Sequence, residues 1–281
     1  MNRLPMRLFF LVSFLLPSLI FIPAFPAGSS DHLTVRLIPE TESIQPGQPV
    51  TVGLYFQMEK GWHIYWKNPG DSGQAPQVSW KLPPGFKAGP LQWPVPERIA
   101  IPSLMDYGYN GEVLLLSTLH APKGLKPSQM IRFSAQVHWL VCQESCIPGQ
   151  ARLELRLPVE NQKLHSHSKW KDLFEATQKK TPLPQPKDWE IHGLSNAKNF
   201  QLDFEADIAA TTAFFFPLHP NQIENAAPQE FTSSDKAFHL RLKKSDQLAE
   251  NIPALEGLLV VTEKGGQDKE YWVKVPLSLG K

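Results

Sequence analysis

Hydrophobic and polar residues alternate along much of the chain after residue 29. Successive side chains of a β-strand point to opposite faces, so this period of two is typical of strands with one buried face. The 27 prolines and 17 glycines of the chain cluster between the alternating segments and favour turns there. In the first half, the predicted strands are residues 33–37, 50–56, 62–66, 78–82, 91–94, 113–119, 137–142 and 151–157. This series of short strands predicts a β-sandwich over residues 30–160.

The alternation resumes in a second segment, residues 191–281. Its predicted strands are residues 200–204, 213–216, 238–242, 258–262 and 271–275. The segment contains no cysteine and none of the motifs typical of phosphate-binding loops, serine hydrolases or zinc peptidases. We therefore expect a second, smaller β-sandwich without a catalytic cluster of its own.

Residues 161–190 differ from both β segments and predict a connector. Its apolar face at helical spacing consists of Trp170, Leu173, Phe174 and Thr177. Ser168 is a candidate N-cap for this short helix. Alternate prolines from Pro182 to Pro186 then stiffen the chain. The predicted fold class is all-β, with two sandwich domains joined by a short helical, proline-rich connector.

Residues 1–29 have the layout of a secretory signal peptide. Arginines precede an apolar run over residues 8–25, and small residues follow at 27–29. Pro17 and Pro23 would interrupt a long membrane helix. No later segment reaches the roughly 18 consecutive apolar residues of a membrane span. We expect a cleaved signal and a soluble, exported protein in the periplasm, a compartment where disulfides form.

The nearly equal numbers of basic and acidic residues indicate whether a nucleic acid could be a partner. The chain has 28 basic and 27 acidic residues and a net charge of +1. Proteins that bind nucleic acids carry clustered basic residues, because phosphate contacts supply much of the affinity. We therefore expect no nucleic-acid partner.

Candidate chemistry is concentrated in the only two cysteines, Cys142 and Cys146. One alternating strand ends at Cys142, and a second begins at Ala151. Pro148-Gly149 is the predicted bend between these strands. The cysteines would then lie at the two feet of a hairpin turn, where their Cα atoms can come within the roughly 4.4–6.8 Å that a disulfide needs.

The residues alone leave three interpretations of this pair open. A structural disulfide here would add little, since closing a loop of about five residues contributes about 2 kcal/mol, against about 4.7 kcal/mol for about a hundred residues. A bond across so short a loop can open without unfolding the domain, which suits redox chemistry. A soft-metal carrier, for copper, would add Met105 or His138 to the thiolates. Because two thiolates supply only half of a tetrahedral zinc site, we expect neither a bound metal nor a cofactor.

Nine short sequence segments form a distinctive combination. Six lie in the first domain: GWHIYWKNPGDSG at 61–73, QWP at 92–94, PER at 96–98, YGYNGEV at 107–113, WLVC at 139–142 and CIPG at 146–149. Three lie in the second, with FFP at 215–217, IE at 223–224 and AAPQ at 226–229. In this combination the chain resembles the periplasmic N-terminal region of the DsbD and ScsB family of thiol:disulfide interchange proteins.

The resemblance implies an immunoglobulin-like redox domain, and by extension two immunoglobulin-like β-sandwich domains. In that family, the redox domain takes electrons from a membrane-embedded DsbD/ScsB-like donor and passes them to periplasmic thioredoxin-fold oxidoreductases. Cys142 and Cys146 match the cysteine pair of the family. The segment 103–108 matches the cap loop that shields the pair, and its candidate shielding residues are Leu104, Met105, Asp106, Tyr107 and Gly108.

Three features depart from the family pattern. The C-x3-C spacing is shorter than in the better-known DsbD domain. Met105 and Asp106 fall near the place of the capping aromatic residue, so Tyr107 or Met105 is the expected shield instead. The membrane bundle and terminal thioredoxin domain of full-length relatives are missing, so we expect that another polypeptide supplies them or that the chain has a different role.

Two residues close to the pair in sequence are candidates for tuning the thiol pKa. Glu144 disfavours a nearby thiolate, whereas His138, when protonated and on the same strand face as Cys142, favours one. Cys142 follows apolar neighbours and Cys146 follows polar ones. We therefore expect Cys146 to form the mixed disulfide and Cys142 to resolve it. Since both cysteines lie in residues 30–160, we also expect that domain alone to carry the redox activity.

Overall fold

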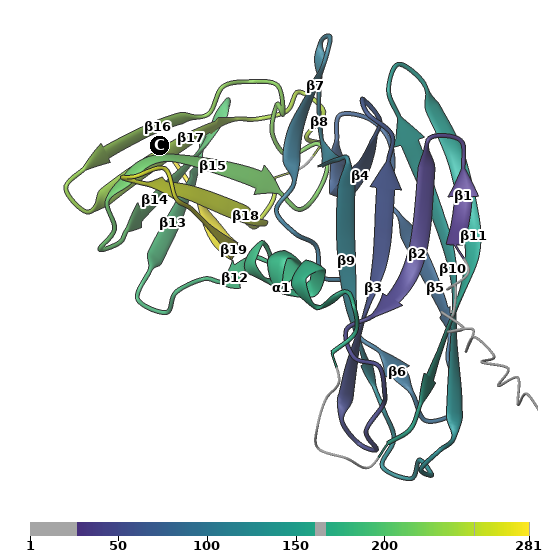
Figure 1. Ribbon diagram of the computed structural model, residues 1–281. Helices are drawn as coiled ribbons and strands as arrows, with labels where there is room; N and C mark the ends of the chain where they lie inside the picture. The colour runs from purple at the N-terminus through teal and green to yellow at the C-terminus, as the bar shows by residue number, and fades with distance from the viewer. Residues whose placement is uncertain (1–26, 161–166, 250, 281) are drawn as a thin grey trace, which may run out of the picture.

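The computed structural model describes residues 27–160, 167–249 and 251–280. Within these ranges nearly all regular structure is β-strand, and α1 (Lys171–Lys179) is the one α-helix. Figure 1 shows two β domains beside each other, with α1 between them. The predicted all-β class with two immunoglobulin-like sandwich domains is therefore confirmed. The expected signal peptide lies outside the described residues, apart from positions 27–29 in the first strand.

Two sheets form the first domain. In hydrogen-bonding order, one sheet consists of β1 (Ala27–Ser30), β2 (Leu33–Pro39), β3 (Pro49–Met58), β9 (Glu112–His120) and β6 (Lys87–Ala88). The other consists of β11 (Cys146–Pro158), β10 (Met130–Cys142), β4 (His63–Gly70), β8 (Leu104–Asn110) and β7 (Glu97–Ile101), with β5 (Gln77–Lys81) also paired to β10. Every strand pair in these two sheets is antiparallel, which is typical of a sandwich built from hairpins.

The alternating sequence pattern accounts for the core between the two sheets. Leu33, Val35 and Leu37 of β2 are at most 2% exposed, and they belong to one hydrophobic cluster. Trp139 and Val141 of β10 enter the same cluster from the opposite sheet. Burial of these alternate residues provides the main stabilisation, at roughly 25 cal/mol per Å² of apolar surface removed from water.

Helix α1 packs against the outer face of the first sheet. Its Phe174 is fully buried, in a small cluster with Tyr55 of β3 and Leu114 of β9. The predicted helix is therefore confirmed, but its N-cap is Trp170 rather than Ser168. Ser168 lies one turn outside the helix, where its hydroxyl oxygen accepts the backbone N–H of Trp170 at 3.2 Å. No helix within the described ranges has the length and apolar character to cross a lipid bilayer.

The second domain is built from one continuous sheet that folds over its own core. In hydrogen-bonding order its strands are β15 (Ala210–Pro217), β18 (Ala254–Glu263), β19 (Asp268–Leu279), β13 (Glu190–Ser195), β14 (Asn199–Glu205), β17 (Ala237–Lys243) and β16 (Glu230–Ser234), with β12 (Leu183–Pro184) also paired to β19. Strand β19 runs antiparallel to β18 and parallel to β13, so it belongs to both halves of the sandwich. Phe200 and Phe215, one from each half, meet in a common core.

The two domains also share apolar packing with each other. Phe216 of β15 belongs to the hydrophobic cluster of the first domain, and its ring centroid lies 4.9 Å from that of Tyr107 in β8. Trp66 of β4 is fully buried and stacks on Trp272 of β19, with ring centroids 5.9 Å apart and planes inclined by 12°. The domains are therefore joined by a packed interface as well as by the connector.

Two local predictions in the first domain are wrong. Residues 103–108, expected as a loop, lie mostly in β8, which pairs with β7 on one side and β4 on the other. Local residues such as Asp106 and Gly108 favour a turn, but pairing on both sides overrides this preference. Residues 91–94, expected as a strand, form only an isolated bridge between Gln92 and Leu116.

Candidate redox site

The two cysteines form a disulfide at the end of the β10–β11 hairpin. The sulfur atoms are 2.05 Å apart, and the two residues are direct partners in the register of the hairpin. The turn consists of residues 143–145, where the backbone N–H of Gln143 donates to the carbonyl of Ser145 at 3.2 Å. The predicted position of the cysteines at the feet of the turn is confirmed, but the predicted bend at Pro148-Gly149 is wrong. Those two residues instead pair with Leu140 and Trp139 within the hairpin.

The two sulfur-bearing residues differ in solvent exposure. Cys142 is only 2% exposed, whereas Cys146 is exposed. Both side chains lie on the outer face of their sheet, since their neighbours Val141 and Ile147 point to the core. Cys142 is less exposed because it has a strand neighbour on each side, Cys146 of β11 and His63 of β4. Cys146 is more exposed because β11 is the edge strand of the sheet. A partner molecule therefore reaches Cys146 more easily.

His63 is the histidine that faces the pair. It lies opposite Cys142 in the strand register and is 3% exposed, and its Nε2 has no hydrogen-bond partner. Burial lowers the pKa of His63 below its usual value, because the imidazolium form loses hydration, and the nearby carboxylate of Asp106 opposes this shift. The predicted tuning residue His138 lies four residues before Cys142, about 13 Å along the strand, and is exposed.

Tyr65 contacts the exposed sulfur directly. Its hydroxyl oxygen lies 3.5 Å from Cys146 Sγ, and because a disulfide sulfur carries no hydrogen, the hydroxyl is the donor. Burial raises the pKa of Tyr65, so the phenol stays protonated and able to donate. On the same face of β4, the ring of His63 packs edge-on to Tyr65 with centroids 5.3 Å apart. The two cysteines, Tyr65 and His63 therefore form one contiguous site.

The segment between β4 and β5, residues 71–76, covers the ring of Tyr65. Gly73 has φ +78°, and a Cβ added to it would lie 2.0 Å from Cζ of Tyr65, so only glycine fits there without displacement. Ser72 anchors the segment to Asp106 of β8, a fully buried residue. The backbone N–H of Ser72 donates to one carboxylate oxygen at 2.9 Å, and its hydroxyl donates to the other at 2.7 Å. We call residues 71–76 the cover segment.

Comparison with known proteins supports a redox site at this place. A family profile described as "Thiol:disulfide interchange protein DsbD, N-terminal" matches residues 34–158, which include both cysteines and the residues around them. Residues 34–158 belong to the DsbD N-terminal family. The expected resemblance is confirmed, and the domain is of the thiol:disulfide interchange type.

Similarity in structure extends beyond this DsbD N-terminal domain. The crystal structure of the N-terminal periplasmic domain of ScsB from Proteus mirabilis aligns with a TM-score of 0.64 at 16% identity, covering 89% of this chain and 95% of that chain. The second domain therefore shares the ScsB fold too. The fimbrial adhesin FimA from Actinomyces aligns with a TM-score of 0.20 at 11% identity, over 88% of this chain and 98% of that chain, too low for any argument. None of the curated proteins matches the sequence.

Residues matching the family's cap loop do not lie over the disulfide as a loop. Leu104 is 39% exposed at the start of β8, next to the turn that joins β7 and β8. Met105 is partly buried against the core, and Gly108 lies so close to β4 that a Cβ would be 2.2 Å from the carbonyl oxygen of Ile64. Asp106 accepts two hydrogen bonds from Ser72 of the cover segment. A shielding role for these residues stays a prediction.

Tyr107, the expected shield, points the other way. It is fully buried among core residues, and its hydroxyl donates to Asn225 Oδ1 of the second domain at 3.0 Å. Burial raises the pKa of Tyr107 well above its usual range, so it stays protonated. Among the described residues, no hydrogen bond or ring contact joins residues 104–108 to either cysteine. Tyr65 is the aromatic residue on the disulfide, and Glu144 is exposed in the turn between the cysteines.

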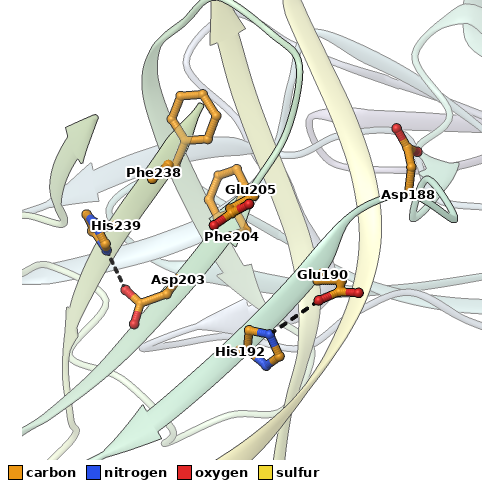
Figure 2. A pocket seen from close by; sticks show the side chains of 9 residues that line it. Asp188, Glu190, His192, Asp203, Phe204, Glu205, Phe238 and His239 are labelled. Atoms are coloured by element: carbon orange, nitrogen blue, oxygen red, sulfur yellow. Dashed lines mark hydrogen bonds and ion pairs between the residues drawn. The ribbon is translucent and has the colours of Figure 1, made fainter. Parts of the chain in front are cut away.

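A hollow lies on the second domain, far from the cysteines in sequence. Figure 2 shows its acidic and imidazole side chains, which include the pairs Asp203–His239 and Glu190–His192. Within the described part of the chain, no group of three or more histidine, cysteine, aspartate or glutamate side chains is arranged to hold a metal ion. The family match covers the cysteine pair and not this hollow, so the cysteine pair is the candidate functional site.

Proposed function

We propose that this chain is an exported dithiol relay that takes reducing equivalents from a membrane-embedded donor of the DsbD/ScsB kind and passes them to periplasmic thioredoxin-fold proteins. The observation that carries the proposal is the exposed Cys146 sulfur of a short-loop disulfide, with the Tyr65 hydroxyl directed at it, in a DsbD N-terminal domain. The short loop allows the bond to open while the sandwich stays folded, because β10 and β11 pair along their whole length.

The relay step is a pair of thiol–disulfide exchanges. In the dithiol form, the Cys146 thiolate attacks one sulfur of the partner's disulfide, and the other partner cysteine leaves as a thiolate and takes up a proton. The Cys142 thiolate then attacks the Cys146 sulfur, and the second partner cysteine leaves and is protonated. Two electrons and two protons have then passed to the partner, and the Cys142–Cys146 bond has re-formed. The membrane donor reverses both exchanges with its own dithiol.

Three neighbouring side chains affect the stability of the Cys146 thiolate in different ways. The Tyr65 hydroxyl stabilises negative charge on Cys146, because a hydrogen bond to a charged acceptor is stronger than one to a neutral acceptor. Glu144, in the turn, opposes that charge and favours protonation. Because burial lowers its pKa, His63 is neutral at pH 7, so it packs against the Tyr65 ring and does not place a positive charge beside the thiolate.

Two observations support a periplasmic location for the proposed relay. The N-terminal 29 residues have the pattern of a signal peptide, and the ScsB domain of similar fold is a periplasmic one. An oxidising compartment is also where a cysteine pair needs a reductant to stay active.

Redox titration tests the proposal. The purified protein is equilibrated in glutathione buffers of graded potential, trapped with a thiol alkylator and analysed by mass spectrometry, while circular dichroism monitors folding. Reversible opening of the bond in the folded protein is expected, followed by disulfide exchange with a thioredoxin-fold protein. A bond that opens only on unfolding would establish an inert structural disulfide. Stoichiometric copper binding without exchange would establish the soft-metal carrier.

A further inference from the structure

The buried side chain of Asn225 connects the second domain to the cover segment beside the redox site. This residue lies between β15 and β16 and is 5% exposed. Its Nδ2 donates to Asp71 Oδ1 at 2.7 Å, and its Oδ1 accepts the Tyr107 hydroxyl at 3.0 Å. Both partners belong to the first domain, so both ends of the Asn225 amide are used across the domain interface.

Asp71 is the first residue of the cover segment, and it is held on both sides. Its Oδ2 accepts the backbone N–H of Met105 at 2.7 Å, and its own N–H donates to the Met105 carbonyl at 3.2 Å. The next two residues are Ser72, which binds Asp106, and Gly73, which lies on the Tyr65 ring. Displacement of Asp71 therefore moves the segment that holds Tyr65 in place.

The interface beside Asn225 is held by further hydrogen bonds and ring contacts. The fully buried Asn68 of β4 donates through Nδ2 to the carbonyl of Pro217 at 2.8 Å, and its Oδ1 accepts the backbone N–H of Gly70 at 3.2 Å. Phe216 packs between Tyr107 and Trp66. Hydrogen bonds and aromatic packing thus fix the second domain to both ends of the segment from Asn68 to Asp71.

We infer that Asn225 is a positioning residue for the redox site: by holding Asp71 it keeps the cover segment on Tyr65, and so keeps the Tyr65 hydroxyl on Cys146. The second domain then acts on the reactivity of Cys146 without touching either sulfur. This inference deepens the proposed function, because it concerns the same cysteine, but its test needs no relay partner.

The groups around Cys146 define what a pH profile of its thiol reports. Tyr65 and His63 face it from β4, Cys142 from β10 and Glu144 from the turn, and Asp106 of β8 acts through Ser72. A change at Asn225 alters none of these side chains chemically. Because Asn225→Asp also adds a negative charge, which itself disfavours a thiolate, its shift is assigned to a change in their positions only when a swap that keeps the net charge of the parent removes it. Tyr65→Phe in the same background gives the shift expected for complete loss of the hydroxyl.

The test measures the alkylation rate of Cys146 by iodoacetamide against pH, in the full chain carrying Cys142→Ser. Asn225→Asp keeps the size of the side chain but places a carboxylate oxygen against Asp71. We expect the pH midpoint to rise by about half a unit or more, which is part of the roughly one unit expected for Tyr65→Phe. Asn221→Asp, in the same loop but exposed, is the matched control and leaves the midpoint unchanged.

A swap of the two residues provides the rescue. In Asp71→Asn with Asn225→Asp, the new amide at position 71 can donate to the new carboxylate, while its oxygen still accepts the N–H of Met105. We expect the midpoint to return to that of the parent, whereas Asp71→Asn alone shifts it. If Asn225→Asp does not fold, the swap and Asp71→Asn alone carry the same comparison. Equal midpoints for Asn225→Asp and Asn221→Asp, or a folded swap that fails to restore the midpoint, overturn the inference.

Discussion

Cys142 and Cys146 occupy equivalent places in one rung of the hairpin, yet only one of them can be approached from solvent. The difference comes from their other neighbours, since β10 continues into contact with β4 at His63, while β11 is an edge strand. Attack along the S–S axis needs access to the sulfur, so the edge position assigns the encounter to Cys146. The exposure expected from the polar residues before Cys146 agrees with the structure.

Trapping separates the roles of the two cysteines. Cys142→Ser removes the resolving thiol, so a thioredoxin-fold partner attacked by Cys146 should stay covalently attached. Cys146→Ser should give about tenfold less complex, because the enclosed Cys142 is a poor target. Non-reducing electrophoresis quantifies the complex. More complex with Cys146→Ser than with Cys142→Ser would show that the roles are reversed.

The lowered pKa of His63 predicts that the stability of the first domain depends on pH. Its folded pKa lies below the unfolded value of about 6.5, so the unfolded chain binds more protons between these two values. The stability associated with neutral His63 is fully present above pH 6.5 and is lost as the pH falls toward the folded pKa. We expect the urea midpoint of the parent protein to fall from pH 7 to pH 5, and that of His63→Phe to fall less.

His138→Phe is the control for this measurement, because His138 lies exposed on the same sheet face. It should leave the pH dependence of the parent unchanged. An equal loss of stability in His63→Phe and the parent would assign the effect to other groups.

The sequence pattern predicts individual strands in the first domain, but it does not predict which strands pair or which side chains meet. Alternation predicts strands with one buried face, and residues 113–119 are found within β9 (Glu112–His120). It does not reveal that Tyr65 meets Cys146, because this contact joins residues 81 positions apart and depends on which strands pair. Pro148-Gly149 suggests a bend, but in the structure Gly149 pairs with Trp139 within the hairpin. A glycine is present there because the ring of Trp139 occupies the space that a side chain would need.

Gly73→Ala tests the packing of the cover segment on Tyr65. The new Cβ would meet the ring in a backbone conformation with φ +78°, so the segment must lift. We expect a loss of about 1–3 kcal/mol in the free energy of unfolding and faster hydrogen exchange at Ser72. Gly111→Ala is the matched control, because Gly111 has φ +69° but no atom within 4 Å of an added Cβ. Equal costs for the two variants would show that backbone conformation alone, and not Tyr65, requires glycine at position 73.

The molecule as a whole behaves as two domains with one shared apolar interface. The expectation that residues 30–160 act alone is untested, but the structure shows what excision would uncover. Trp66 and Tyr107 are both fully buried, and both lie against rings of the second domain. An excised first domain would expose this aromatic surface and release the cover segment from Asn225.

Cooperative unfolding reports whether the interface couples the domains. Phe216→Ala removes a ring from the interface, and Phe215→Ala removes one from the core of the second domain; each change should cost about 3–5 kcal/mol. We expect one calorimetric transition for the parent and for Phe215→Ala, but two for Phe216→Ala. Two transitions already present in the parent would mean that the interface does not couple unfolding.

The stacked pair of Trp66 and Trp272 places two indole rings nearly parallel across the domain boundary. Transition dipoles held this close and in fixed orientation couple as an exciton, which gives a split circular dichroism band that vanishes when the rings separate. The circular dichroism of this tryptophan pair would therefore report separation of the domains without an added label. Because Trp66 follows Tyr65 directly in β4, spectra of the oxidised and reduced protein would show whether opening the disulfide changes the packing of the two rings at the interface between the domains.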